Sequence, residues 1–139
     1  MAKAKIVVTD DDPEIRDTLQ AMLEMRGYRA VTAADRDEGM DTIRRERPDL
    51  VILDVMMESW QDGFEMSREM RKDPELKNIP ILMLTAVGER TGIDVKSSAG
   101  DPTWLPVDSF LEKPVAPSVL FTRIEELLLD KAIQKPMPA

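Results

Sequence analysis

The sequence predicts an α/β fold in which a parallel sheet is covered by helices on both faces. Short apolar runs alternate with amphipathic segments along the chain, and the runs are apolar at nearly every position. Strands of this kind are buried on both faces, which is the arrangement of parallel sheets. The length of 139 residues suits one domain with a single hydrophobic core.

The alternation predicts five strands and four helices. We expect the strands at Lys5–Thr9, Tyr28–Thr32, Asp49–Leu53, Pro80–Leu84 and Ser109–Leu111. The first three helices are expected from Pro13 to a stop at Gly27, from Asp35 to Arg47, and from Asp62 or Gly63 to Lys72. The last helix follows from Leu120, Ile124, Leu127 and Leu128, which share one helical face.

The composition excludes several classes of function. There are 19 basic and 27 acidic residues, and the net charge of -8 disfavours binding to nucleic acid or an anionic membrane, so a protein partner is expected. The chain has no cysteine and no histidine, which excludes disulfides, the usual zinc ligands and serine–histidine triads. No membrane-spanning stretch or signal peptide is visible, and we expect a soluble cytoplasmic protein.

Polar residues suited to phosphate chemistry stand at the ends of four predicted strands. Asp10 and Asp11 follow the first strand, Asp54 follows the third, and Thr85 and Lys113 close the last two. Parallel strands end at a common edge, where α/β sheets bind their ligands. We therefore expect these side chains to converge, and without histidine any phosphoryl chemistry must use carboxylates.

Each of these residues also has an ordinary structural explanation. Asp12 before Pro13 is explained as a helix N-cap, but capping needs one aspartate and leaves Asp10 and Asp11 for a cation. Asp54 has apolar residues on both sides, which is unusual for a turn residue. Thr85 or Lys113 alone would indicate nothing.

Four segments together carry a family resemblance: Lys5–Arg16, Asp49–Met57, Pro80–Ala86 and Phe110–Val115. They resemble the receiver domain of two-component response regulators, of the chemotaxis-regulator and flavodoxin-like kind, over residues 3–130. The resemblance implies a doubly wound five-stranded parallel sheet of order 2-1-3-4-5. Residues 131–139 are then expected to be a short tail, with no output domain.

The resemblance implies a phosphorylation-activated switch built around one aspartate. Asp54 would accept a phosphoryl group from the phosphohistidine of a sensor histidine kinase or a phosphotransfer protein. Asp10, Asp11, Asp54 and the backbone carbonyl of Met56 would hold Mg²⁺, which prefers a few hard oxygen ligands. The reaction would be limited to phosphorylation and dephosphorylation of the domain itself, so no enzyme in the usual sense is expected.

The remaining site residues would stabilise and report the phosphorylated state. Thr85 and Lys113 would bind phosphoryl oxygens. Thr85 and Phe110 would form the switch. Phe110 lacks the hydroxyl of a tyrosine, and an ordinary core residue is an equally good explanation of it. The signal would pass to a downstream protein, with no direct contact to nucleic acid or membrane.

Three features depart from the family pattern. Residues 58–63 replace the usual proline-containing turn, and Trp60 among them is a candidate partner contact. Between Thr85 and Lys113 the chain is longer than usual and rich in glycine and proline, so we expect a long loop in place of all or part of the fourth helix, with Trp104 as a second candidate contact. Thr9 stands where the family usually has an apolar residue, and we expect it to adjust the packing below the acidic pair.

Two other functions remain as alternatives. A phosphorylation-independent interaction module would still bind its partner after Asp54→Ala. A Mg²⁺-dependent phosphohydrolase with an aspartyl nucleophile would turn over a phosphoester, although such enzymes usually carry a second acid where this chain has Met56.

Overall fold

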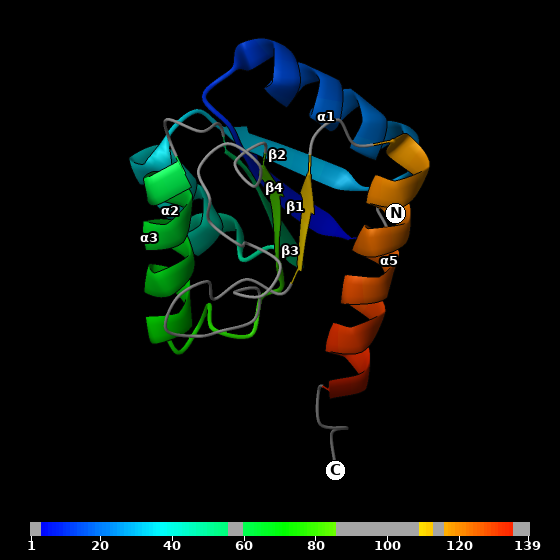
Figure 1. Ribbon diagram of the computed structural model, residues 1–139. Helices are drawn as coiled ribbons and strands as arrows, with labels where there is room; N and C mark the ends of the chain where they lie inside the picture. The colour runs from blue at the N-terminus through cyan, green and yellow to red at the C-terminus, as the bar shows by residue number, and fades with distance from the viewer. Residues whose placement is uncertain (1–3, 56–59, 86–108, 113–115, 135–139) are drawn as a thin grey trace.

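The computed structural model describes residues 4–55, 60–85, 109–112 and 116–134, with the backbone alone for residues 54, 55, 60–64, 85, 110, 112 and 130–134. Strands and helices alternate along the chain (Figure 1). The elements are β1 (Lys5–Thr9), α1 (Pro13–Met25), β2 (Arg29–Ala33), α2 (Arg36–Glu46), β3 (Leu50–Val55), α3 (Trp60–Lys72), β4 (Ile81–Thr85), β5 (Ser109–Glu112) and α5 (Pro117–Gln134).

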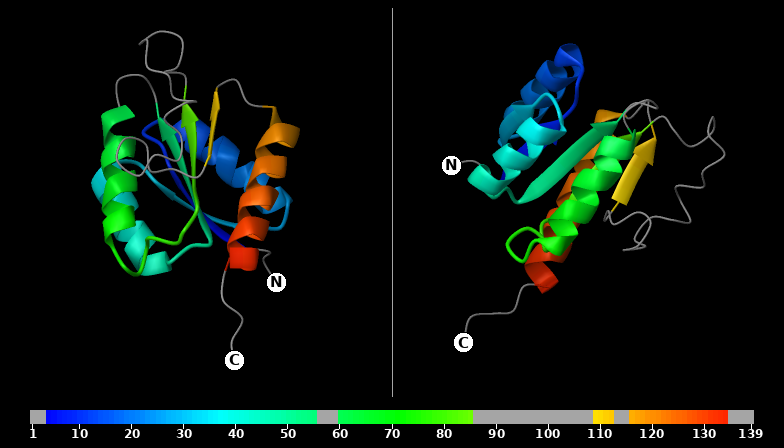
Figure 2. Two further views of the ribbon diagram at one scale, coloured as in Figure 1. Left: turned by 60° about the horizontal axis from the view of Figure 1, so that its bottom comes forward. Right: turned by 90° about the vertical axis from the view of Figure 1, so that its left-hand side faces the viewer.

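The strands form one parallel sheet in the order β2-β1-β3-β4-β5. Helices α1 and α5 cover one face of this sheet, and α2 and α3 cover the other (Figures 1 and 2). The predicted α/β class, with a parallel sheet between two helical layers, is confirmed. Strand β3 lies between β1 and β4, in the middle of the sheet.

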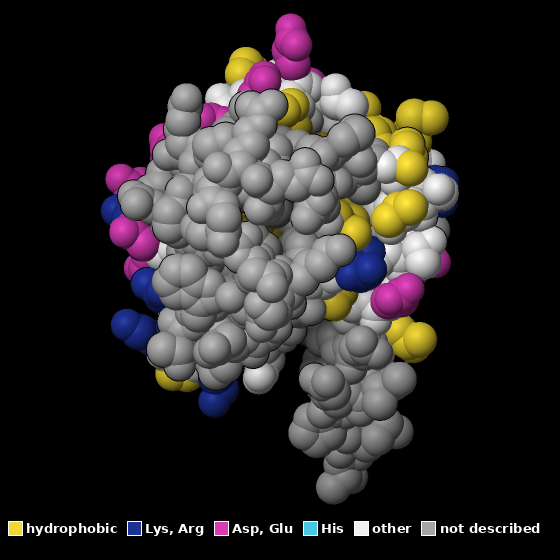
Figure 3. Space-filling view, in the orientation of Figure 1, with side chains coloured by type: hydrophobic (Ala, Val, Ile, Leu, Met, Phe, Trp, Pro, Cys, Tyr) yellow, Lys and Arg dark blue, Asp and Glu magenta, His cyan; other side chains and the backbone are white. Residues whose placement is uncertain are grey.

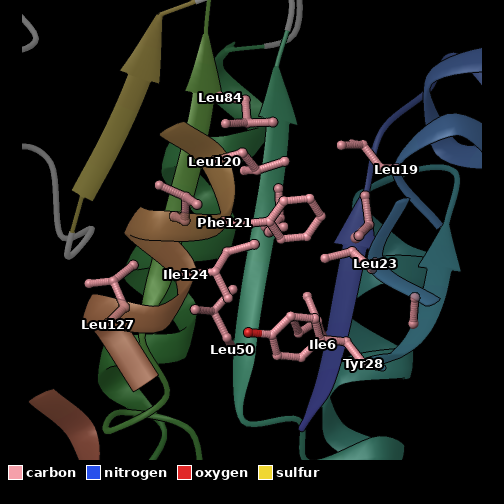
Figure 4. Close-up of a cluster of buried hydrophobic side chains, with 14 residues drawn as sticks. Ile6, Leu19, Leu23, Tyr28, Leu50, Leu84, Leu120, Phe121, Ile124 and Leu127 are labelled. Atoms are coloured by element: carbon pink, nitrogen blue, oxygen red, sulfur yellow. The ribbon is translucent and has the colours of Figure 1, made fainter. Parts of the chain in front are cut away.

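Each face of the sheet has its own hydrophobic core, because successive side chains of a strand point to opposite faces. Towards α2 and α3, the buried strand residues pack against Met40, Ile43, Met66 and Met70, which are at most 4% exposed. Towards α1 and α5 they pack against the other helical core residues: Leu19, Leu23, Leu120, Phe121, Ile124 and Leu127 (Figure 4). The apolar face predicted for the last helix is confirmed in α5, with Leu128 only partly buried.

Aspartate caps fix the starts of α1 and α2. The Oδ1 atom of Asp12 accepts a hydrogen bond from the Glu14 N–H at 2.9 Å, and Oδ1 of Asp35 accepts one from the Glu38 N–H at 2.8 Å. Gly27 follows α1 with a φ of 90°, a conformation that glycine adopts without strain. The predicted cap at Asp12 and stop at Gly27 are both confirmed.

Three predicted boundaries were wrong by two residues or more. Strand β3 continues to Val55 because its backbone pairing with β4 continues there, and pairing does not depend on side-chain polarity, so Asp54 lies within the strand. Helix α3 begins at Trp60, which makes residues 60–63 of the predicted loop helical. Helix α5 runs to Gln134, four residues into the predicted tail, because residues 131–134 contain neither glycine nor proline.

The longest predicted loop remains a prediction. Residues 86–108, where we expect a replaced or shortened fourth helix, lie outside the described residues, and Trp104 lies among them.

Candidate functional site

The register of the sheet brings the acidic strand ends to one edge. Thr9 of β1 pairs with Leu53 of β3, so the next positions along the two strands are Asp10 and Asp54. On the other side of β3, Val55 pairs with Thr85, the last residue of β4. The backbones of Asp10, Asp54 and Thr85 therefore lie at the same edge of three neighbouring strands, as the sequence predicts.

The fifth strand points to the same edge. Thr85 pairs with Glu112, the residue immediately before Lys113. Lys113 itself and Met56 lie outside the described residues. The structure describes only the backbone of four further candidates: Asp54, Thr85, Phe110 and Trp60. The side-chain roles of these six residues remain predictions.

Asp10 is held from several directions. It is 2% exposed, and its Oδ1 atom accepts a hydrogen bond from the Asp12 N–H at 2.8 Å. Its own N–H donates to the carbonyl of Ala33 at 3.1 Å, at the end of β2. A buried carboxylate is costly to desolvate unless hydrogen bonds or a cation compensate for it. These backbone hydrogen bonds therefore hold Asp10 in a buried position at the carboxyl end of β1.

Arg16 is a site residue that the sequence analysis missed. Its Nη1 atom donates a hydrogen bond to the backbone carbonyl of Asp10 at 2.8 Å. The guanidinium also brings a positive charge to the acidic edge, which is the carboxyl end of β1 and β3 with Asp10, Asp11 and Asp54. This charge reduces the repulsion between the carboxylates. The signal in the sequence was a basic residue one turn into the helix that follows the acidic pair.

The described donors fit a hard cation but do not form a complete site. Asp10 is buried at the carboxyl end of β1, and the neighbouring Asp11 is exposed to solvent. Among the side chains that the structure describes, which exclude Asp54, no group of three or more His, Cys, Asp or Glu residues could hold a metal ion. Carboxylate oxygens without nitrogen or sulfur ligands suit Mg²⁺, which keeps several of its waters.

A doubly wound parallel sheet with an acidic edge at its middle strands defines an α/β domain of flavodoxin-like topology. The chain belongs to the response regulator receiver domain family, whose model matches residues 6–125. The family resemblance of the four sequence segments is thereby confirmed, and the domain is a component of two-component signalling.

Known proteins of this family are similar over most of the chain. A probable transcriptional regulator, ycf27, of Cyanophora paradoxa is 41% identical over 91% of this chain and 48% of its own length. The transcriptional regulatory protein AfsQ1 of Streptomyces coelicolor is 36% identical over 88% of this chain and 50% of its own length. The chain thus spans about half the length of the curated relatives it matches.

Solved structures show the same fold. The chemotaxis response regulator CheY4 of Vibrio cholerae is 30% identical and superposes with a TM-score of 0.72, covering 89% of this chain and 98% of that protein. A putative response regulator from Chloroflexus aurantiacus is also 30% identical, with a TM-score of 0.75 over 91% and 98% of the two chains. Within the described residues, none of the helices has the length and apolar character needed to cross a membrane.

Proposed function

We propose that this domain is a signalling switch in which Asp54 accepts a phosphoryl group from a phosphohistidine in a Mg²⁺-dependent reaction. One observation carries the proposal. The sheet register sets Asp54 on the middle strand, between β1, which Asp10 follows directly, and β4, which ends at Thr85. The backbones of the proposed nucleophile, of one proposed metal-binding acid and of the proposed hydroxyl donor therefore lie at one edge of the sheet, which supports the proposal.

The transfer exchanges one bond to phosphorus for another. A carboxylate oxygen of Asp54 attacks the phosphorus, the bond from phosphorus to the donor imidazole nitrogen breaks, and that nitrogen leaves with the electron pair. Asp10 and Asp11, with Asp54 and the backbone carbonyl of Met56, would hold the metal ion. When bound, Mg²⁺ would offset the negative charge on the phosphoryl oxygens.

The product is an aspartyl phosphate, whose oxygens Thr85 and Lys113 would bind. Thr85 and Phe110 would change position with phosphorylation and pass the signal on. Attack by water on the acyl phosphate releases phosphate and restores Asp54, so the signal limits itself. The reaction changes the state of the domain and does not turn over an external substrate, so the domain acts as a signalling protein.

We infer protein partners on both sides of the signal. The donor would be a sensor histidine kinase or a phosphotransfer protein, acting in the cytoplasm. The acidic composition disfavours direct binding of nucleic acid by these residues. Since similar proteins are named transcriptional regulators, an effect on transcription would pass through a protein contact or through another segment of a longer chain.

The proposal is tested by phosphorylation with a small donor. The protein is incubated with acetyl phosphate and Mg²⁺, and intact mass spectrometry counts the phosphoryl adducts. We expect one adduct that is absent without Mg²⁺ and absent in Asp54→Ala. The matched control is Asp41→Asn, an exposed carboxylate on α2, which should be phosphorylated like the wild type.

The other outcomes separate the alternatives. An adduct that survives in Asp54→Ala would overturn the assignment of the phosphoacceptor. If the wild type forms no adduct with either acetyl phosphate or a phosphorylated kinase, and Asp54→Ala still binds its partner, the domain is an interaction module. Steady turnover of a phosphoester would instead identify a phosphohydrolase.

A further inference from the structure

Two locally unfavourable residues meet directly behind the acidic edge. Thr9, the last residue of β1, is 8% exposed, and its Oγ1 atom has no hydrogen-bond partner among the residues that the structure describes. Gly39 lies in the first half of α2 without the positive φ that would explain a glycine. A buried unsatisfied hydroxyl and a glycine within a helix both reduce stability. Such exceptions to local preference are expected where a site demands them.

The two residues are explained by the closeness of α2 to β1. A Cβ atom added to Gly39 would lie 2.9 Å from Oγ1 of Thr9 and 3.1 Å from its Cγ2. It would also lie 2.8 Å from Cε of Met66, the mobile end of a flexible side chain. Non-bonded carbon atoms prefer separations of about 3.5–4.0 Å. Gly39 is therefore required for space, and the helix backbone lies directly against the Thr9 side chain.

This contact adjoins the backbone that carries Asp10. Thr9 precedes Asp10, whose N–H donates to Ala33 at the end of β2. Asp35, two residues further along, caps α2. The end of β1, the end of β2 and the start of α2 are thus joined around Asp10, and a displacement of α2 against Thr9 would be transmitted to the buried carboxylate.

We propose that Thr9 and Gly39 are a positioning pair for the metal-binding carboxylates. The Thr9 side chain fills the space that the missing side chain of Gly39 leaves, and this fit sets the position of Asp10 relative to Asp54. Neither residue is proposed to contact the metal or the phosphoryl group. The inference rests on the proposed function and deepens it by naming what holds the acidic edge in place.

The test measures Mg²⁺ affinity without any phosphodonor, by isothermal titration calorimetry on the full chain. Gly39→Ala should weaken Mg²⁺ binding about ten-fold, as the loss of supporting contacts around metal ligands usually does. Thr9→Ala should weaken it as well, because the support is removed. The double variant Thr9→Ala/Gly39→Ala should bind more tightly than either single variant, because the removed Oγ1 and Cγ2 atoms make room for the new methyl group.

Hydrogen exchange gives a second readout. The amides of Asp10 and Asp12, which donate to Ala33 and to Oδ1 of Asp10, report the position of this backbone. Their exchange should be faster in the single variants and should recover in the double variant. Ile43→Val is the control, because it removes a buried methyl group from the same helix and leaves both Thr9 and Gly39 unchanged. It should lower stability and leave Mg²⁺ affinity unchanged.

The outcomes separate this inference from the proposed function. If the wild type does not bind Mg²⁺ at all, the proposed function fails and the inference fails with it. If the wild type binds Mg²⁺ and all variants bind it equally well, the inference alone is overturned. Should Gly39→Ala not fold, the comparison of Thr9→Ala with the double variant decides, and equal affinities would again overturn the pair.

Discussion

Three consecutive aspartates at the end of β1 occupy three different environments. Asp10 is buried and its Oδ1 atom accepts the Asp12 N–H. Asp11 is exposed to solvent, and Asp12 uses its Oδ1 atom to cap α1. The path of the backbone, rather than the residue type, thus separates a buried acid, an exposed acid and a structural cap.

Because Asp12 is a helix cap, we expect its hydrogen-bonding oxygen, and not its charge, to contribute to stability. Asp12→Ala should lower the free energy of unfolding by about 1 kcal/mol, because the Glu14 amide loses its acceptor. Asp12→Asn keeps a capping oxygen and should have a stability close to that of the wild type. Urea denaturation measures both, and both variants should still accept a phosphoryl group. Loss of phosphorylation in the folded Asp12→Asn protein would show that the charge of Asp12 belongs to the metal site.

At the scale of single residues, the sequence predicts those whose chemistry is unusual. The acidic residues at the strand ends stand out because carboxylates rarely follow apolar runs without a reason. Arg16 and Gly39 did not stand out, because their importance arises from contacts with Asp10 and Thr9 that depend on where the helices lie. The sequence shows a basic residue and a glycine in helices but not the distances to β1.

At the scale of elements, one ion pair joins the start of β1 to the end of α2. Nζ of Lys5 lies 3.2 Å from Oε1 of Glu46 and donates to the Glu46 carbonyl at 3.2 Å. Nε of Arg45 lies 3.2 Å from Oε2 of the same glutamate. The hydrogen bond from Lys5, and then that from Arg45, hold the pKa of Glu46 below its ordinary value of 4.5. The charged form of Glu46 is therefore favoured in the folded state.

This lowered pKa makes part of the stability depend on pH. A carboxyl group whose pKa is lower in the folded state contributes stability above its unfolded pKa and loses it as the pH falls through the folded value. Glu46→Gln should therefore be less stable than the wild type at neutral pH, and the difference should fade below pH 4.5. Urea denaturation across a pH series measures it, with Lys5→Met expected to show the same trend. A difference that does not change with pH would contradict the assignment.

The ion pairs between α2 and the α3 region are weaker determinants of the fold. Arg36 pairs with Glu65, Nη2 of Arg44 lies 2.8 Å from Oε1 of Glu69, and Nη2 of Arg47 lies 2.9 Å from Oε2 of Glu75. Acidic and basic side chains are visible along this side of the molecule (Figure 3). Exposed pairs contribute about 0–1 kcal/mol each, so the methionine-rich core beneath them has the larger effect on how the two helices pack.

The order and type of the described elements could be predicted from hydrophobic periodicity, and the ends of several elements could not. Strand β3 outlasts its apolar run because pairing with β4 continues through Asp54 and Val55. Helix α3 begins at Trp60, ahead of the apolar residues whose helical spacing predicted it, because a first helical turn needs no buried face. Pairing and backbone hydrogen bonding determine these ends, and neither is visible in the order of apolar residues.

At the scale of the whole molecule, the proposed function would oppose stability at the acidic edge. The chain carries a net charge of -8, and neighbouring carboxylates at one edge of the sheet repel one another. In the proposed function, a bound cation would relieve this repulsion and would bind only the folded state. The free energy of unfolding of the metal-free domain should therefore be lower than that of the Mg²⁺-bound domain.

Asp11→Asn tests this opposition directly, because Asp11 is exposed and its replacement leaves the core intact. Without Mg²⁺, this variant should be more stable than the wild type, since one charge is removed from the acidic edge. With Mg²⁺ at ten times the dissociation constant, the wild type should gain about 1.4 kcal/mol by mass action, and Asp11→Asn should gain almost nothing at the same concentration. Asp41→Asn removes the same charge from the middle of α2 and should gain as much as the wild type. Urea denaturation with and without Mg²⁺ measures all three proteins, and an equal gain for Asp11→Asn would remove Asp11 from the metal site.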